Sequence, residues 1–522
     1  MVPVQRPVIP SGSSGESPRS ISARITRNSV VVFAAKAIES TASLIVMMLL
    51  TRMLQLQRWG DFAFINAIVL AFQPLINLEL NTILIREMAR NRIREKALLG
   101  GGLLVKLCLV TLFVICAVIL DRTLQLEPLL RMAFYLAVAG EVFQQVSWVY
   151  STVFMARERM EFEPLLSLVF RVTSVGGIIL TAVLVPRDRW TTTGFFMVFL
   201  IMAVSQALRA TAGMVIASRF LKSFRVQWSF SVARELLHQS WIMGIATFCT
   251  GLTLRLDIYF LRYFKGSETV GLFHLPHMYS LQIQILAVSV VTALFPVMSR
   301  WAGDMQQKER YRKAQDLGIR TINLFGLSIA AVSVLFPEWI IRLLGGSAYM
   351  PAQPALIILA WIIPILFLNY LCTNLLITIQ KQALLIYGAV VSLVLNTALD
   401  ILWIPRYGII GASVATVISY ASQLMIVLIL LKIHSRNPLH FMSAVGIPWL
   451  FCAGAAVLAR YTIPVLSSTP VVDYVFRGAT AAGIIFGMLA LQPGEVRRMI
   501  VQSRRRSSPV PEPFSSPDSS RD

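Results

Sequence analysis

Apolar stretches about 20 residues long or longer recur along almost the whole chain, separated by short polar connections. A helix needs roughly 20 apolar residues to cross the hydrocarbon core of a membrane, and lipid offers its backbone no other hydrogen-bond partners. We place these stretches approximately at residues 28–51, 61–85, 98–120, 129–156, 164–185, 191–218, 239–261, 269–298, 318–344, 351–379, 382–404, 408–431, 441–459 and 471–491. The pattern predicts an all-α integral membrane protein with about 14 transmembrane helices.

Composition and charge support this class and argue against others. Of the 522 residues, 56% are apolar and only 14% are charged, whereas about 25% charged is usual in soluble domains. The net charge is +21, but the basic residues gather in the short connections, as they do in the cytoplasmic loops of membrane proteins. We therefore expect no nucleic acid partner. The five cysteines are scattered through apolar stretches without a CxxC pair, so neither a disulfide framework nor a metal site is indicated.

The distribution of basic residues also predicts the orientation. Residues 1–27 and 493–522 are rich in polar residues and proline and are predicted to be disordered tails, the second of them basic. The most basic connections follow the second and eighth stretches, at residues 86–96 and 308–313. Because cytoplasmic loops carry the excess of Lys and Arg, we expect both tails and both connections in the cytoplasm.

Two turns in the chain have similar sequences, and we call them the echoing turns. The turn after the first stretch reads LLTRMLQLQRWGDFAF and the turn after the seventh reads YFLRYFKGSETVGLFH, each with an Arg upstream of a Gly that Phe62 or Phe273 closely follows. A repeat in corresponding positions is typical of transporters built from two related halves. We therefore predict two related halves, the second of which begins near residue 239.

Three segments carry a family resemblance. They read RNSVVVFAAKAIESTASLIVMMLLTRMLQLQRWGDFAFINAI, LRLDIYFLRYFKGSETVGLFHLPHMYSL and LNTALDILWIPRYGIIGASVATVISY. They resemble the polysaccharide-export flippases of the O-antigen (Wzx) type, in the multidrug/oligosaccharidyl-lipid/polysaccharide exporter superfamily. That superfamily includes lipid II flippases and multidrug and toxin extruders, and the resemblance extends over nearly the whole chain in the number and spacing of spans.

The resemblance implies two pseudo-symmetric helical bundles that open a central cavity to each side of the membrane in turn. It implies a first bundle at 28–218, a cytoplasmic linker at 219–238, a second bundle at 239–434 and two trailing helices at 435–492. It also implies a transporter rather than an enzyme, without cofactor, for the surface polysaccharides of a bacterium (O-antigen or exopolysaccharide). Its substrate would be a lipid-linked (polyprenyl-diphosphate) oligosaccharide that passes from the cytoplasmic to the outer leaflet of the bacterial inner membrane. Membrane lipids and other polysaccharide-assembly proteins are the further partners expected.

Four ionisable residues lie in the first spans of the two halves, Lys36 and Glu39 in one, Arg255 and Asp257 in the other. A charge at the bilayer centre costs roughly 2.5–3.5 kcal/mol on insertion scales, so each should face a partner or a wet cavity. We predict that all four line the central cavity and that Arg255 and Lys36 bind a diphosphate through charge-assisted hydrogen bonds. The alternative is a set of ion pairs that only holds the bundles together.

Polar side chains at helical spacing predict a wet interior in other spans. They are Glu141, Gln144, Gln145 and Trp148 in the fourth span, Asn66, Gln73, Asn77 and Asn81 in the second, and His277, Ser280 and Gln284 in the eighth. Pro74 predicts a kink in the second span. Amides and aromatic rings suit sugars, although the same groups can simply join helices. The predicted cavity residues are thus Lys36, Glu39, Asn77, Glu141, Gln144, Gln145, Arg255, Asp257, His277 and Gln284.

For the other polar residues in the spans we predict no role in substrate or metal binding. Arg171, Arg209 and Arg477 lie alone in apolar sequence and are interpreted as residues that snorkel or cap a helix. His274 and His277 have no carboxylate nearby on their helix face, so we predict no metal site. No nucleotide-binding motif occurs in a plausible context.

Three alternatives to a flippase stay open. The first is a cation-coupled multidrug extruder, which would favour acidic and aromatic groups over the basic ones seen here. The second is a membrane glycosyl polymerase or ligase, which the short outer connections disfavour, and the third is a scaffold for polysaccharide assembly. Glu39, Glu141 and Asp257 are candidates for proton transfer, but the sequence leaves ion coupling, the glycan and the oligomeric state open.

Overall fold

The computed structural model describes residues 18–90, 94–157, 159, 161–220, 227–302, 308–379, 381–434, 445–466 and 470–490, and their regular secondary structure is helical. The side chains of the first helix are described from Thr41 onward. The α-helices are α1 (Pro18–Ala71), α2 (Gln73–Asn77), α3 (Leu80–Arg90), α4 (Glu95–Leu124), α5 (Pro128–Ala156), α6 (Phe162–Leu184), α7 (Phe195–Phe220), α8 (Phe230–Thr253), α9 (Leu256–Lys265), α10 (Ser267–Ala302), α11 (Lys308–Leu335), α12 (Pro337–Leu344), α13 (Gln353–Leu359), α14 (Ile362–Thr378), α15 (Leu385–Tyr407), α16 (Ile409–His434), α17 (Ile447–Leu466) and α18 (Pro470–Ala490).

The helices confirm an all-α membrane protein. Over the described residues, 8 helices are long and apolar enough to cross a membrane, or 9 if the bent pair α13 and α14 is one span. Each predicted apolar stretch falls on one helix or on two or three consecutive helices, so the prediction of about 14 spans is compatible with the structure. Helix α1 starts at Pro18, within the predicted tail of residues 1–27, and residues 1–17 and 491–522 lie outside the described residues.

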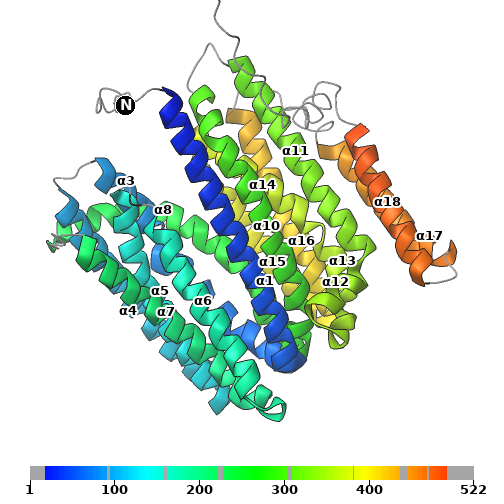
Figure 1. Cartoon of the computed structure of the whole chain (residues 1–522), viewed down its shortest axis with the longest axis horizontal. Coiled ribbons are helices and arrows are strands. Elements are labelled where there is room, and N and C mark those ends of the chain that lie inside the picture. Colours follow the sequence, from blue (N-terminus) through cyan, green and yellow to red (C-terminus); the bar gives the residue numbers. More distant parts are fainter. Residues whose placement is uncertain are drawn as a thin grey trace, which may run out of the picture. The chain divides into compact units, whose positions relative to one another are not determined.

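The chain divides into two compact units, residues 1–296 and 297–522. In the first unit α5 packs against α7, α3 and α1, and α6 packs against α7, so that α4 to α7 form a group of neighbouring helices (Figure 1). Helix α8 crosses this group by packing against α4, α2 and α3. The division of the spans into bundles at 28–218 and 239–434 remains a prediction.

The outer faces of α4 and α6 are apolar and exposed. Leu107 in α4 is 62% exposed and Val183 in α6 is 75% exposed, and their neighbours along the same faces are also large and apolar. A continuous apolar face of this kind would destabilise a protein in water but is the normal surface of a helix against lipid. These faces therefore mark the lipid side of the first unit.

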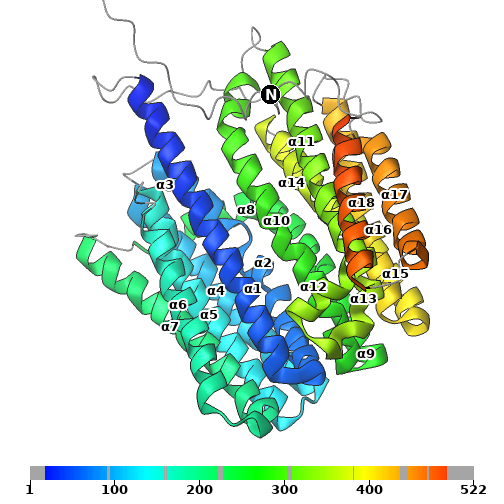
Figure 2. The same cartoon turned by 45° about the vertical axis from the view of Figure 1, so that its right-hand side comes forward.

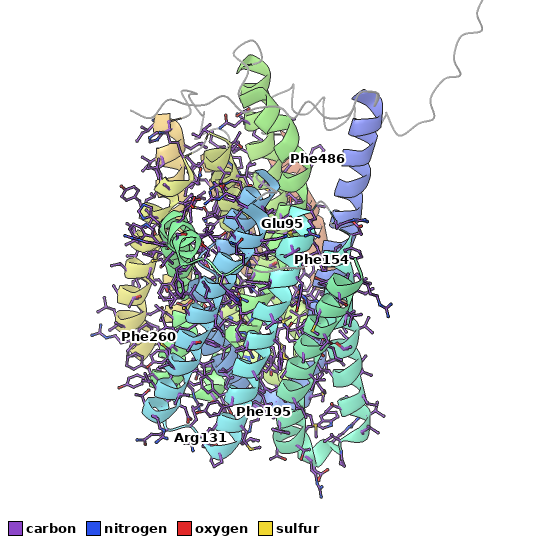
Figure 3. The ribbon with its side chains drawn as sticks, turned by 90° about the vertical axis from the view of Figure 1, so that its left-hand side faces the viewer. Glu95, Arg131, Phe154, Phe195, Phe260 and Phe486 are labelled. Atoms are coloured by element: carbon purple, nitrogen blue, oxygen red, sulfur yellow. The ribbon has the colours of Figure 1, made fainter. Side chains whose placement is uncertain are left out.

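Two ion pairs join the antiparallel helices α4 and α5 at both ends. Arg131 pairs with Asp121 at 2.9 Å, and Arg157 pairs with Glu95 at 2.8 Å. Figure 3 shows Arg131 at the lower end of these helices and Glu95 well above it. The charges thus stay near the helix ends, where a membrane protein can keep them in contact with water or headgroups.

In the second unit, α11 packs against α14, and α15 and α16 form a close pair. The last two helices, α17 and α18, lie side by side (Figure 2) and pack against α11 through apolar residues that include Leu327, Cys452 and Met488. Glu338 in α12 accepts hydrogen bonds from Arg460 in α17, at 2.7 Å, and from Arg477 in α18, at 3.1 Å. Arg477, which the sequence left without a partner, is therefore part of an ion-pair network.

Several predicted spans are interrupted rather than continuous. The second breaks between α1 and α3, the seventh breaks between α8 and α9, and the tenth bends by 44° between α13 and α14. Helix α1 itself contains a non-helical residue, Gln55. In transporters, substrate and ion sites are typically formed where membrane helices are discontinuous, so these breaks direct attention to their neighbouring side chains.

Candidate functional site

The break in the second span is a short helix flanked by unusual backbone. Leu78 and Glu79 both have positive φ angles, 42° and 55°, a conformation that side-chain-bearing residues rarely adopt. The interruption begins at Phe72, directly before α2. Pro74, at which the sequence predicted a kink, lies in the first turn of α2. As a result Asn66, Gln73, Asn77 and Asn81 lie on three helices, and the single polar face predicted for them is not present.

The interruption directs Asn77 toward a buried lysine. The Asn77 side chain donates to the Gln73 carbonyl at 3.0 Å and accepts a hydrogen bond from Lys106 Nζ in α4. Lys106 is 5% exposed, and its ammonium lies 5.5 Å from the centre of the Trp148 ring. A buried ammonium needs such partners, because an isolated charge in an apolar environment is strongly unfavourable.

Glu141 and Gln145 in α5 complete the set that we call the Lys106 cluster, namely Asn77, Lys106, Glu141 and Gln145. Both α5 side chains are buried, and Gln145 donates a hydrogen bond to Glu141. Glu141 interacts electrostatically with Lys106 and with Arg255. The structure therefore brings together three predicted cavity residues around Lys106, which was not among the predicted residues. The sequence did contain a signal for it, because Lys106 is a charged residue within the apolar stretch of α4, and such residues usually face a partner or a wet cavity.

Gln144, the neighbour of this cluster on α5, lines a cavity between α1, α5, α6 and α7. This cavity, the first-bundle cavity, has a volume of about 410 Å³ and is also lined by Glu141 and Trp148. Gln206 in α7 donates to Gln144 at 2.8 Å across it. Helical spacing correctly predicted that these α5 side chains share a polar face, and the tertiary structure supplies the opposite wall.

Two arginines expected to be alone have partners in the same cavity. Arg209 in α7 forms an ion pair with Glu163 in α6 at 2.9 Å, and Arg171 in α6 donates to Ser43 of α1 at 2.8 Å. Both arginines line the first-bundle cavity. The prediction that they are lone residues is wrong because their partners come from other helices, far away in sequence.

Arg255 and Asp257 lie at the break between α8 and α9. Arg255 separates the two helices and donates to the Gly251 carbonyl at 3.4 Å, whereas Asp257 lies in the first turn of α9 and is fully buried. The two residues are therefore not on one continuous helix, although the sequence predicted a single span at 239–261. Both interact electrostatically with His277 of α10, so this second group of predicted residues is also brought together.

The predicted residues of α10 differ in their surroundings. His277 is 1% exposed and packs against Phe273, with 5.2 Å between ring centres. His274 packs against Trp59 at 4.9 Å, and Gln284 is half-buried. Among the described side chains, no group of three or more His, Cys, Asp or Glu residues is arranged to hold a metal ion. Lys36 and Glu39 lie outside the described side chains.

The two echoing turns meet directly within the first unit. Asp61 of α1 is 2% exposed and accepts from Arg58 at 3.0 Å and from Ser267, and it lies 3.3 Å from Arg262. Next to Asp61 the backbones of α1 and α10 approach each other closely at Gly60 and Gly271. A Cβ atom added to Gly60 would lie 1.8 Å from the Ser267 carbonyl oxygen, and one added to Gly271 would lie 2.4 Å from the Leu56 carbonyl oxygen. The sequence showed the repeat but not this contact.

The chain matches the sequence models of two protein families. The sequence model of a family described as "Polysaccharide biosynthesis protein" matches residues 25–302, and that of the family MatE matches residues 243–402. The first match includes the Lys106 cluster and the α8 to α9 break.

Two curated relatives come from archaea. The chain is 26% identical over 301 residues to "Uncharacterized membrane protein MJ1068" of Methanocaldococcus jannaschii, which covers 55% of this chain and 56% of that protein. It is 23% identical over 329 residues to "Probable low-salt glycan biosynthesis flippase Agl15" of Haloferax volcanii, covering 62% of this chain and 66% of that protein. The chain thus spans less than two thirds of the length of these relatives.

Solved structures show the same fold. The "Lipid II flippase MurJ, inward closed conformation" aligns with a TM-score of 0.69 and 13% identity, covering 90% of this chain and 100% of that chain. The "MATE multidrug transporter DinF-BH in complex with R6G" aligns with a TM-score of 0.57 and 16% identity, covering 77% of this chain and 93% of that chain. The arrangement of helices is therefore one that flippases and drug transporters share.

Proposed function

Because the chain belongs to the polysaccharide biosynthesis protein family, we propose that it is a flippase for a lipid-linked oligosaccharide. The observation that carries the proposal is the buried polar region of the first unit, where Lys106, Glu141 and Arg255 interact within otherwise apolar helices. Ionisable groups buried within membrane-spanning helices are costly and usually mark a substrate or ion pathway. The transported molecule would be a polyprenyl diphosphate that carries a glycan, moved from the cytoplasmic to the outer leaflet.

Arg255 is our candidate for the diphosphate, together with Lys36. It lies at a helix break and carries the planar group that binds two oxygens at once. Lys106 adds a third basic group in the same unit. The negative headgroup would lower the cost of burying these cations, and Glu141 and Asp257 would balance them when the site is empty.

Transport would follow alternating access between the bundles at 28–218 and 239–434. The contact of Asp61 with Arg262 and Ser267 joins the first turn of each half, and we infer that it separates during the transport cycle. The location we propose is the cytoplasmic membrane, in a bacterium the inner membrane, with both termini in the cytoplasm. The distribution of Lys and Arg supports this orientation, and O-antigen or exopolysaccharide assembly is the expected pathway.

The decisive experiment is deletion of the gene in its own host, followed by extraction of lipid-linked glycans. We expect intact lipid-linked repeat units to accumulate and the surface polysaccharide to disappear, and a plasmid copy should restore both. Loss of the lipid-linked units themselves would indicate a synthetic enzyme. Unchanged glycans and unchanged surface polymer would reject the flippase.

A second candidate function is a multidrug extruder, because the MatE family model matches residues 243–402. In that case the deletion strain should retain rhodamine 6G and become sensitive to cationic dyes while its glycans stay normal. The basic residues of the buried region disfavour a cationic substrate, so we rank this function second.

A further inference from the structure

The first-bundle cavity has the size of a small ligand site. Its volume of about 410 Å³ lies at the low end of the roughly 300–1,000 Å³ found in ligand pockets. That volume accommodates roughly one or two sugar rings, but not a complete lipid-linked repeat unit. The cavity can therefore hold only part of the substrate proposed above.

Three buried polar atoms at this cavity lack a partner. They are Glu163 Oε2, Gln206 Oε1 and Arg209 Nε, for which the described part of the chain supplies no hydrogen bond. The Gln206 and Arg209 residues are only 9% and 8% exposed. A buried polar group without a partner is unfavourable, so these atoms favour a ligand that can satisfy them.

The kinds of atoms indicate which ligand fits. Two of the three are acceptors and one is a donor, and a hydroxyl group both donates and accepts. A diphosphate could only accept, and a metal ion could only bind the acceptors, so each would leave part of the set unsatisfied. The formal charges also cancel, because the cavity is lined by two carboxylates, Glu141 and Glu163, and two guanidinium groups, Arg171 and Arg209.

The remaining wall suits a sugar as well. Trp148, Phe170 and Phe199 line the same space, and an aromatic face packs well against the apolar face of a sugar ring. We propose that the first-bundle cavity binds one or two neutral sugar rings of the lipid-linked oligosaccharide. Gln206 and Glu163 would accept hydrogen bonds from hydroxyl groups and Arg209 Nε would donate one. This inference rests on the proposed flippase function and adds a specificity site within the first unit.

The test uses the full chain in lipid nanodiscs and, as probe, the oligosaccharide released by mild acid from the lipid-linked glycans of the host. Two variants change the cavity in different ways. Gln206→Leu removes polar groups, and Ala137→Leu fills space, because Ala137 lines the cavity. The matched control is Ala139→Leu, which makes the same change two residues along α5 at a position outside the lining. Thermal melting verifies that all three variants are folded.

We expect saturation-transfer NMR and calorimetry to show that the wild type and Ala139→Leu bind the oligosaccharide equally well. Gln206→Leu and Ala137→Leu should each bind it at least about tenfold more weakly. Inorganic pyrophosphate should not compete with the oligosaccharide. Competition by pyrophosphate, or equal binding by all four proteins, would overturn the sugar site.

A transport assay in vesicles separates this inference from the function on which it rests. If the wild type does not move the lipid-linked glycan, the flippase proposal fails. If the wild type moves it and both cavity variants move it equally fast, the flippase stands and the sugar site is rejected. Slow transport by both cavity variants, with normal transport by Ala139→Leu, is the result we expect.

Discussion

Asp61 of α1 accepts a hydrogen bond from Ser267 of α10, although 206 positions separate the two residues in the chain. The same carboxylate pairs with Arg58 and Arg262. A single buried acidic group therefore joins the two turns that the sequence shows as a repeat. In a transporter of two related halves, such a contact is a natural place for closure.

Asp61→Asn should weaken this contact. The substitution keeps the shape of the side chain but leaves two arginines without their negative partner. Because Arg262 is 30% exposed and water screens its charge, we expect a loss of only about 1–2 kcal/mol, measured as a lower melting temperature in detergent. Arg159→Gln is the control, since its pair with Glu161 lies at the surface. A melting temperature equal to that of the wild type would contradict the role of Asp61.

Gly60→Ala should be poorly tolerated. The added Cβ would lie 1.8 Å from the Ser267 carbonyl oxygen, so α1 and α10 would have to separate. We expect a marked fall in the amount of folded protein recovered by size-exclusion chromatography. Gly176→Ala in α6 is the matched control, because nothing lies within 4 Å of its added Cβ. Alanine there should leave stability unchanged or raise it by up to about 1 kcal/mol. Equal recovery of both variants would argue against the close crossing.

Lys106→Met should abolish transport and also lower stability, since it removes the cationic partner of Asn77 and Glu141. The double variant Lys106→Met with Glu141→Gln removes both charges, and we expect it to regain most of the stability but not the transport. The measurements are thermal melting and flipping of lipid-linked glycan in vesicles. Recovery of transport in the double variant would show that the cluster has only a structural role.

Glu338→Gln should loosen the last two helices. The carboxylate binds Arg460 in α17 and Arg477 in α18, and its loss leaves both guanidinium groups with a weaker acceptor. We expect faster hydrogen exchange in α17 and α18 than in α15 and α16, and a loss of roughly 1–3 kcal/mol. Glu268→Gln serves as control because Glu268 is exposed. Unchanged exchange in α17 and α18 would show that apolar packing alone holds them.

Much of the fold was predictable because membrane spans obey a simple requirement for length and hydrophobicity. The positions of α4, α6 and α15 match their predicted stretches within a few residues. The polar face of α5 was also predictable, because Glu141, Gln144, Gln145 and Trp148 follow the helical period. Pro74 indicated the interruption of the second span, which begins at Phe72. Sequence periodicity alone cannot show where a helix is interrupted, so the break at Arg255 was not foreseen.

The sequence by itself determined the class of protein, the approximate spans and the residues whose burial demands an explanation. Only the tertiary structure decided which partner each of those residues has. Lys106 donates to Asn77 and interacts electrostatically with Glu141, Arg209 pairs with Glu163, and the two echoing turns meet at Gly60 and Gly271. The physical reason is that hydrophobicity and helical period act along a single helix, whereas hydrogen bonds and ion pairs between helices depend on how the helices pack.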